Sequence, residues 1–156
     1  MIRELSFETR FRQSPEELFP FFAEAANLER LTPDALRFRI LTPPPLVMRP
    51  DLRIDYRLRL HGLSFRWRTR ITRWEPPRLF QDLQERGPWA LWEHTHDFTP
   101  LPGGGTLMTD RLRLRPPFGL LGRLLWPLLA REVAGIFAHR ERVLRSLFGP
   151  PPVVMR

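Results

Sequence analysis

The sequence contains no cysteine, no lysine and no run of about 18 apolar residues. Without cysteine the chain can form no disulfide, no thiolate metal site and no cysteine nucleophile. Without a long apolar run it offers no segment that would span a bilayer as a helix. The first twelve residues alternate charged and apolar side chains, so they lack the apolar region of a signal peptide. We therefore expect a cytoplasmic protein.

What the chain does contain is typical of a globular domain. Of its 156 residues, 42% are hydrophobic and 27% are charged, which argues against disorder. The length suits one domain, which we place at residues 1–149, followed by a flexible tail at 150–156. All 25 basic residues are arginine and the net charge is +8. This charge permits an acidic partner without identifying one.

Alternating apolar and polar residues predict seven β-strands. The first covers residues 4–12, and two short helices follow it. One helix starts at Ser14 with a serine cap and Pro15, and the other covers Asn27–Leu31. The remaining strands are expected at 36–41, 52–60, from 65 to the Pro76-Pro77 pair, 79–85, 90–98 and 106–115.

The last part of the chain has a different pattern. From Leu120 to Phe148 apolar residues recur at helical spacing, and Pro127 is expected to kink this helix or to begin its regular part. The 22 residues from Pro127 to Phe148 would span about 33 Å, close to the length of a ten-residue strand. One long helix could thus cover one face of the sheet. The sequence predicts an α+β fold with a curved antiparallel sheet.

The hairpin turns also predict which residues face each other across the sheet. A turn at Gly62-Leu63, a turn at Pro76-Pro77, and glycine-containing loops after residues 86 and 102 set the expected register. On the inner face the expected pairs are Leu58–Trp67, Tyr56–Thr69, Thr69–Asp82, Trp67–Gln84, Asp82–His94, His94–Asp110 and His96–Met108. On the outer face, Arg57 is expected opposite Arg68 and Arg59 opposite Arg66.

This register gives the inner face a polar row among aromatic and aliphatic side chains. A buried polar group without a partner costs about 1–3 kcal/mol, so the row must pair internally, hold water or contact a ligand. We expect a cavity that binds a small amphipathic molecule. The candidate ligand-binding residues are Tyr56, Leu58, Trp67, Thr69, Asp82, Gln84, Trp92, His94, His96, Met108, Asp110, Val133 and Phe137.

Two other interpretations of the polar row stay open. In the first, it is a satisfied core network in which His94 lies between Asp82 and Asp110. There the carboxylates would favour the charged form of His94, although burial opposes this. In the second, His94 acts with Asp82 and Asp110 as general acid and base in a cyclisation or dehydration. We assign no catalytic residue.

The remaining signals give weaker predictions. His94 and His96 share a strand face and could bind a metal with Asp82 or Asp110, but two histidines are a short ligand set, so we assign no metal and no cofactor. Arginines on the outer face could contact RNA or a ribosome, yet no aromatics accompany them, which disfavours nucleic acid. The apolar stretch 116–126 could gate the cavity, contact a membrane peripherally or pair two copies, so monomer and homodimer both remain open.

Several of these segments together resemble the SRPBCC superfamily. They are NLERLTP (27–33), IDYRLRLHG (54–62), FRWRTRITRWEPP (65–77), FQDLQERGPWALWEHTHDF (80–98) and GGTLMTDRLRLRPPFG (104–119). The similarity covers about residues 3–148 and is greatest to small bacterial ligand-binding proteins described as polyketide cyclase/dehydrase-like. It implies the START or birch-pollen-allergen helix-grip fold. It also implies a hydrophobic cavity for a lipid-, polyketide- or isoprenoid-like ligand. It transfers no catalytic residue.

Overall fold

In the computed structural model, which describes residues 1–152, seven strands form one antiparallel sheet in the order β1-β7-β6-β5-β4-β3-β2. The strands are β1 (Arg3–Phe11), β2 (Arg39–Ile40), β3 (Arg53–Leu60), β4 (Leu63–Glu75), β5 (Leu79–Arg86), β6 (Leu91–Pro100) and β7 (Thr106–Arg115). The helices are α1 (Pro15–Ala23), α2 (Asn27–Leu31), the 3-10 turn η1 (Asp34–Leu36), α3 (Gly119–Leu124) and α4 (Trp126–Phe148). The predicted seven strands and long C-terminal helix are confirmed.

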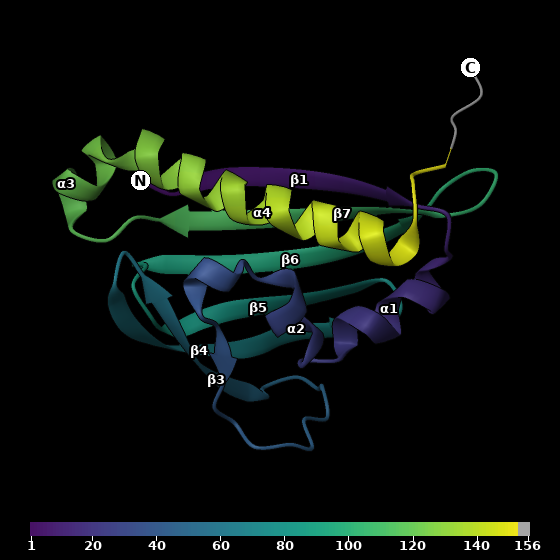
Figure 1. Ribbon diagram of the computed structural model, residues 1–156, viewed down its shortest axis with the longest axis horizontal. Helices are drawn as coiled ribbons and strands as arrows, with labels where there is room; N and C mark the ends of the chain where they lie inside the picture. Colours follow the sequence, from purple (N-terminus) through teal and green to yellow (C-terminus); the bar gives the residue numbers. More distant parts are fainter. Residues whose placement is uncertain (153–156) are drawn as a thin grey trace.

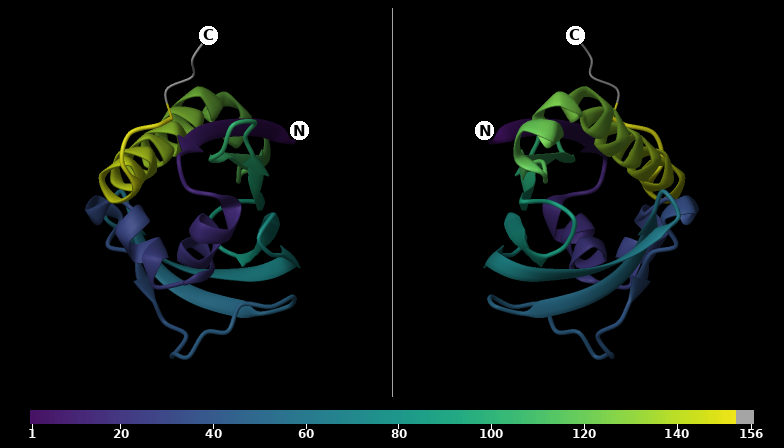
Figure 2. Two further views of the ribbon diagram at one scale, coloured as in Figure 1. Left: turned by 90° about the vertical axis from the view of Figure 1, so that its right-hand side faces the viewer. Right: turned by 90° about the vertical axis from the view of Figure 1, so that its left-hand side faces the viewer.

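The sheet curves around one side of α4. This helix runs along β1 and β7, while β6, β5, β4 and β3 bend away beneath it (Figure 1). Viewed end-on, the curved sheet and α4 enclose the interior, and α1 and α2 lie between them (Figure 2). This is the helix-grip arrangement. None of the described helices combines the length and the apolar composition that crossing a membrane would require.

Local sequence signals explain the helix boundaries. Ser14 caps α1, because its hydroxyl accepts from the backbone N–H of Glu17 while the Glu17 carboxylate accepts from the backbone of Ser14. Pro127 lies in the first turn of α4, where a missing N–H costs nothing. The helical segment is interrupted at Leu125, which separates α3 from α4. Pro127 therefore lies at the start of the long regular helix, as one of the two expected alternatives had it. Gly149 ends it.

Two expected segments differ in the structure. The strand expected at 36–41 is shortened to the two residues of β2. The reason is that η1 occupies Asp34–Leu36 and that Arg37 takes a left-handed conformation with φ 43°. That conformation is incompatible with an extended strand. Of the expected tail, residues 150–152 form no helix or strand, and 153–156 lie outside the described residues.

The hairpin of β3 and β4 turns one residue earlier than expected. Its loop is His61-Gly62, with φ 48° and 82°, and Leu60 pairs with Leu63. Positive φ at both loop residues is the signature of a type I′ turn, which matches strand twist. The sequence signal was His-Gly rather than the common Asn-Gly. The shift places Tyr56 opposite Trp67 and Leu58 opposite Phe65, so the predicted pairs Leu58–Trp67 and Tyr56–Thr69 are wrong.

Two further registers shift in the same way. Glu75 pairs with Leu79 around a three-residue loop, and a register irregularity between Ile71 and Arg73 then sets Thr69 opposite Gln84 rather than Asp82, which removes the Trp67–Gln84 pair. Pro100 pairs with Thr106, so His96 faces Asp110 and His94 faces Leu112, instead of the predicted His96–Met108 and His94–Asp110 pairs. The Asp82–His94 pair is confirmed. Each wrong register is off by two residues on the inner face, so every side chain keeps its predicted face.

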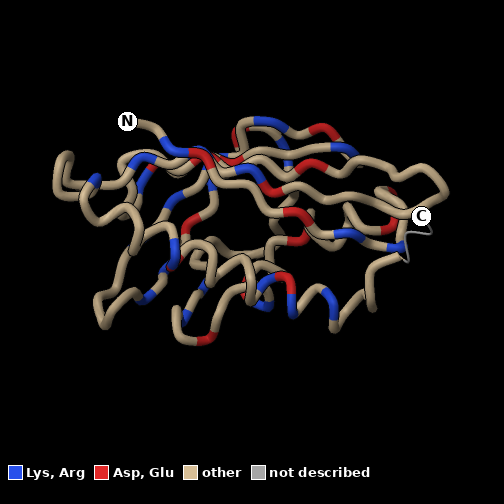
Figure 3. Tube along the Cα trace, turned by 90° about the horizontal axis from the view of Figure 1, so that it is seen from above, with Lys and Arg blue, Asp and Glu red and all other residues tan. Residues whose placement is uncertain are grey.

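The outer face changes partners accordingly. Arg68 faces Asp55 rather than Arg57, and its guanidinium donates to both carboxylate oxygens at 2.8 and 2.9 Å. Arg59 lies opposite Ser64, and Arg57 lies opposite Arg66, so both predicted arginine pairs, Arg57–Arg68 and Arg59–Arg66, are wrong. Further ion pairs join Arg53 and Arg70 to Glu85. Acidic and basic positions are interspersed along the chain trace (Figure 3), so part of the positive charge is neutralised locally.

Candidate functional site

A cavity of about 190 Å³ lies between the inner face of the sheet, α1, α2 and α4. Its walls are mostly apolar, and its polar side chains come from β3 to β6, from α4 and from the α1–α2 region. A dry apolar cavity of about 150 Å³ is large enough to bind benzene, so this cavity has room for a ligand. Among the predicted ligand-binding residues, those that line it are Tyr56, Leu58, Trp67, Thr69, Asp82, Trp92, His94, His96 and Phe137.

The other four predicted residues do not line this cavity. Met108 packs in the aromatic core near α1, and Val133 packs against Leu112 and Leu114. Gln84 instead holds the loop after β5, because its amide donates to the Trp89 carbonyl at 2.7 Å. Asp110 lies behind the histidines, on the wall of a second pocket between β1 and α4.

Sequence reasoning missed one whole wall of the cavity. That wall comes from α1, α2, η1 and the loops near them, and it includes Phe21, Leu28, Leu36, Phe38 and Met48. These segments are short and their apolar residues show no clear helical or strand periodicity. The sequence pattern therefore could not predict which of their side chains face the interior.

Arg140 was missed as well, although the sequence holds a signal for it. It occupies the place in the α4 stripe between Phe137 and Leu144 where helical spacing calls for an apolar residue. The side chain is buried beneath the sheet. A charged residue in such a position needs a partner, and in this chain the partner is Asp110.

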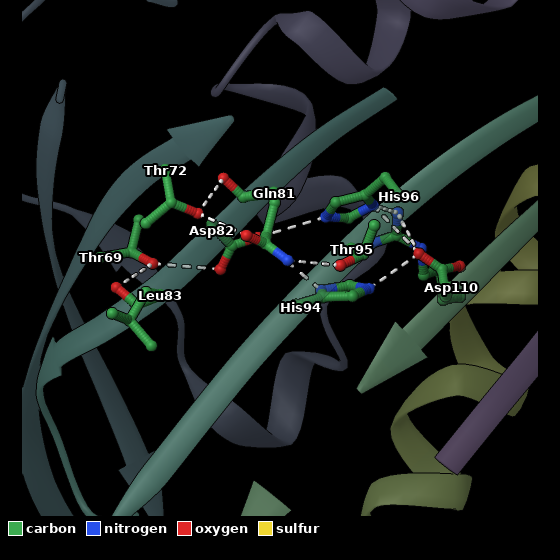
Figure 4. Close-up of polar contacts among 10 residues, drawn as sticks. Thr69, Thr72, Gln81, Asp82, Leu83, His94, Thr95, His96 and Asp110 are labelled. Carbon is green, nitrogen blue, oxygen red and sulfur yellow. Dashed lines mark hydrogen bonds and ion pairs between the residues drawn. The ribbon is translucent and has the colours of Figure 1, made fainter. Parts of the chain in front are cut away.

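Five side chains, Asp82, His94, His96, Asp110 and Arg140, form a polar cluster at one end of the cavity. Figure 4 shows the first four of them. His94 Nε2 lies 2.8 Å from Asp110 Oδ1, and His96 Nδ1 lies 3.0 Å from the same oxygen. His96 Nε2 is 3.3 Å from Asp82 Oδ2. Thr69 donates to the other oxygen of Asp82 at 3.1 Å. His94 thus reaches Asp110 diagonally across the ladder although it is not directly opposite.

The carboxylates of the polar cluster are held in their charged form. Burial would raise the pKa of Asp110, but the Arg140 guanidinium and hydrogen bonds from both histidines outweigh it and hold that pKa well below its usual range. Burial likewise opposes ionisation of Asp82, but the hydrogen bond from His96, supported by the electrostatic effect of the neighbouring histidines, still lowers its pKa.

His94 behaves differently from the expectation. Burial and the neighbouring His96 lower the pKa of His94, and the two carboxylates only partly oppose this. The prediction that Asp82 and Asp110 would favour its charged form is therefore wrong, because desolvation is the larger effect. The lowered pKa favours the uncharged imidazole, which keeps one nitrogen lone pair.

Stacking fixes both imidazoles in place. The His96 ring lies between Phe80, at a centroid distance of 3.9 Å, and His94, at 3.8 Å. Phe137 from α4 packs edge-on against His94. Asp82, His94 and His96 each offer one ligand atom, and these atoms lie within 4.8 Å of one another. The cluster can therefore bind a polar atom of a ligand, exchange a proton with it, or hold a cation.

Comparisons with known proteins identify the family and agree with the fold. The sequence model of the family described as polyketide cyclase / dehydrase and lipid transport matches residues 12–139. A START superfamily protein from Mycobacterium smegmatis has a similar structure, with a TM-score of 0.66 and 14% identity, over 92% of this chain and 98% of that one. A comparison with curated protein sequences gave no match.

Two further solved structures have the same fold. Protein CV1439 from Chromobacterium violaceum gives a TM-score of 0.72 at 13% identity, over 95% of this chain and 99% of that one. TTHA0849 from Thermus thermophilus gives a TM-score of 0.67 at 16% identity, over 93% of this chain and 99% of that one. At these identities the similarity establishes the fold alone.

Proposed function

Because the chain belongs to the polyketide cyclase / dehydrase and lipid transport family, we propose that it binds a small hydrophobic or amphipathic molecule in the cavity between the sheet and α4. The ligand is lipid-, polyketide- or isoprenoid-like. The observation that carries the proposal is the contrast within this cavity, where aromatic and aliphatic walls end at the polar cluster. Transfer of an apolar ligand body from water to such walls contributes about 25 cal/mol per Å².

The polar cluster orients the ligand. Arg140 lines the cavity, and its Nε is buried without a hydrogen-bond partner among the described residues. A buried N–H without a partner is costly, so a ligand oxygen that accepts from it would gain the hydrogen bond and relieve the cost. We therefore propose a ligand with one oxygen-bearing end, placed against Arg140, and an apolar body against Trp67 and Trp92.

Filling the cavity should abolish binding. Ile136 lines the cavity from α4, so Ile136→Trp would place an indole where the ligand body lies. We expect at least a tenfold loss of affinity for decanoate, measured by displacement of the fluorescent probe 1-anilinonaphthalene-8-sulfonate. The matched control is Leu147→Trp, at an exposed position of the same helix that does not line the cavity. Equal affinities of the two variants would place the ligand elsewhere.

Ligand exchange with a membrane would use the exposed apolar residues at the start of the C-terminal helices, here called the α3 patch. They are Phe118, Leu120, Leu121, Leu124, Leu125 and Leu128. Arg123 and Arg131 lie among them, and no acidic residue occurs between 116 and 131. Apolar side chains accompanied only by positive charge suit peripheral contact with anionic lipid.

The α3 patch gives its own prediction. The protein should co-sediment with phosphatidylglycerol vesicles more than with phosphatidylcholine vesicles. A Leu120→Ser, Leu124→Ser double variant should reduce this binding at least tenfold, since each buried leucine contributes about 1.5–3 kcal/mol. Val47→Ser with Leu63→Ser removes two equally exposed apolar side chains elsewhere and should leave it unchanged. Retained binding by the α3 variant would refute membrane contact through this patch.

A further inference from the structure

Three ligand atoms converge on one point of the cavity wall. Asp82 Oδ2 lies 3.3 Å from His96 Nε2 and 3.9 Å from His94 Nδ1. The second distance is too long for a hydrogen bond. A divalent cation bound at about 2.0–2.1 Å to each of three tetrahedral ligands would separate those ligands by about 3.3 Å. The Asp82–His96 separation already matches this value, all three ligand atoms lie within 4.8 Å of one another, and an inward movement of His94 would complete the arrangement.

The polar atoms of these three side chains that would not bind the metal already have the partners that such atoms have in metal sites. Metal-bound histidines donate their other ring N–H to a carboxylate, and bound carboxylates are themselves hydrogen-bonded. Here His94 Nε2 and His96 Nδ1 both lie within 3.0 Å of Asp110 Oδ1, and Thr69 donates to Asp82 Oδ1. One buried carboxylate thus orients both imidazoles.

The charges favour a cation at this point. The polar cluster contains the two carboxylates of Asp82 and Asp110 but only one guanidinium, that of Arg140. An excess negative charge in a buried site is costly, and a bound cation removes it. Arg140 Nη2 contacts His96 Nδ1 at 3.4 Å and lies 3.6 Å from Asp110 Oδ1. When His96 Nδ1 carries the proton, that guanidinium can pair with Asp110 instead.

We propose that Asp82, His94 and His96 form a binding site for a divalent transition metal ion of the Zn²⁺ type, with Asp110 and Thr69 as positioning residues. Two imidazoles and one carboxylate are the ligands that such ions prefer, whereas Mg²⁺ and Ca²⁺ require more oxygen ligands. All three ligands line the cavity, so the open coordination position faces it. At that position the ion would coordinate an oxygen of the molecule bound in the cavity. This last role rests on the proposed function.

Metal titration tests the site without any ligand in the cavity. Protein freed of metal with EDTA is titrated with Zn²⁺ by calorimetry and with Co²⁺ by visible absorption. We expect about one ion per chain, and the Co²⁺ spectrum of a four- or five-coordinate site. Asp82→Asn should abolish this signal. Thr69→Val keeps the β-branched shape and should lower the affinity about 10–100-fold, because it removes only the orienting hydrogen bond.

Controls separate this site from surface histidines and from unfolding. His61→Gln and His139→Gln remove the two histidines outside the cluster and should leave the titration unchanged. Zn²⁺ should raise the melting temperature of the wild type but not of Asp82→Asn, whose fold is checked separately by circular dichroism. Absence of binding in the wild type, or binding unaffected by Asp82→Asn and Thr69→Val, would overturn the metal site while leaving the cavity proposal standing.

Discussion

Replacing Arg140 with methionine is expected to lower the free energy of unfolding by about 3–5 kcal/mol. The substitution preserves most of the side-chain volume and removes the charge. Asp110 then stays buried without its guanidinium partner, which is otherwise 3.6 Å away. The phenylalanine rings of Phe22 and Phe137 also lose their contact with the guanidinium. Guanidinium chloride unfolding followed by tryptophan fluorescence measures the loss.

Two companion variants identify the cause of this loss. Arg145→Met removes an arginine from an exposed pair with Glu141 on the same helix and should cost no more than about 0.5 kcal/mol. Adding Asp110→Leu to Arg140→Met should recover part of the stability, because the uncompensated carboxylate is gone. If the double variant is no more stable than the single one, the cost arises from packing and not from charge.

Phe98→Ala is expected to destabilise the protein by about 3–5 kcal/mol. Phe98 is fully buried on β6, two residues from His96, and packs against the rings of Phe19 and Phe22 at centroid distances of 5.3 and 5.2 Å. The cavity left behind cannot close easily, because α1 and the sheet hold its walls apart. The same unfolding experiment measures the effect.

The matched control makes the same chemical change on the surface. Phe118 is 79% exposed, so Phe118→Ala should change stability by no more than about 0.5 kcal/mol. A comparable loss for both variants would mean that Phe98 is not part of a rigid core.

The sequence predicted the sheet and its faces because strand patterning has a period of two. An error of two residues in register, as at His61-Gly62, leaves every face unchanged. That is why Asp82, His94 and His96 could be placed on the inner face from the pattern alone. Their exact neighbours could not be predicted, since these depend on turn conformations such as a positive φ at a histidine.

Other parts of the site depend on tertiary contacts that leave no local pattern. Leu36 and Phe38 reach the cavity only because Arg37 turns the chain between them. The lowered pKa of His94 follows from the depth of its burial, and spacing in the sequence does not report depth. Arg140 is the exception, because a charge within an apolar helical stripe is visible in the sequence.

The two edges of the sheet are unequal. On one side β2 is two residues long, and the following loop contains Pro43, Pro44, Pro45 and Pro50, which have no backbone N–H to offer. On the other side β1 is nine residues long and, within the described chain, pairs only with β7. The β1 edge is therefore the longer continuous edge, and a strand from another molecule that extends this sheet would pair most extensively there.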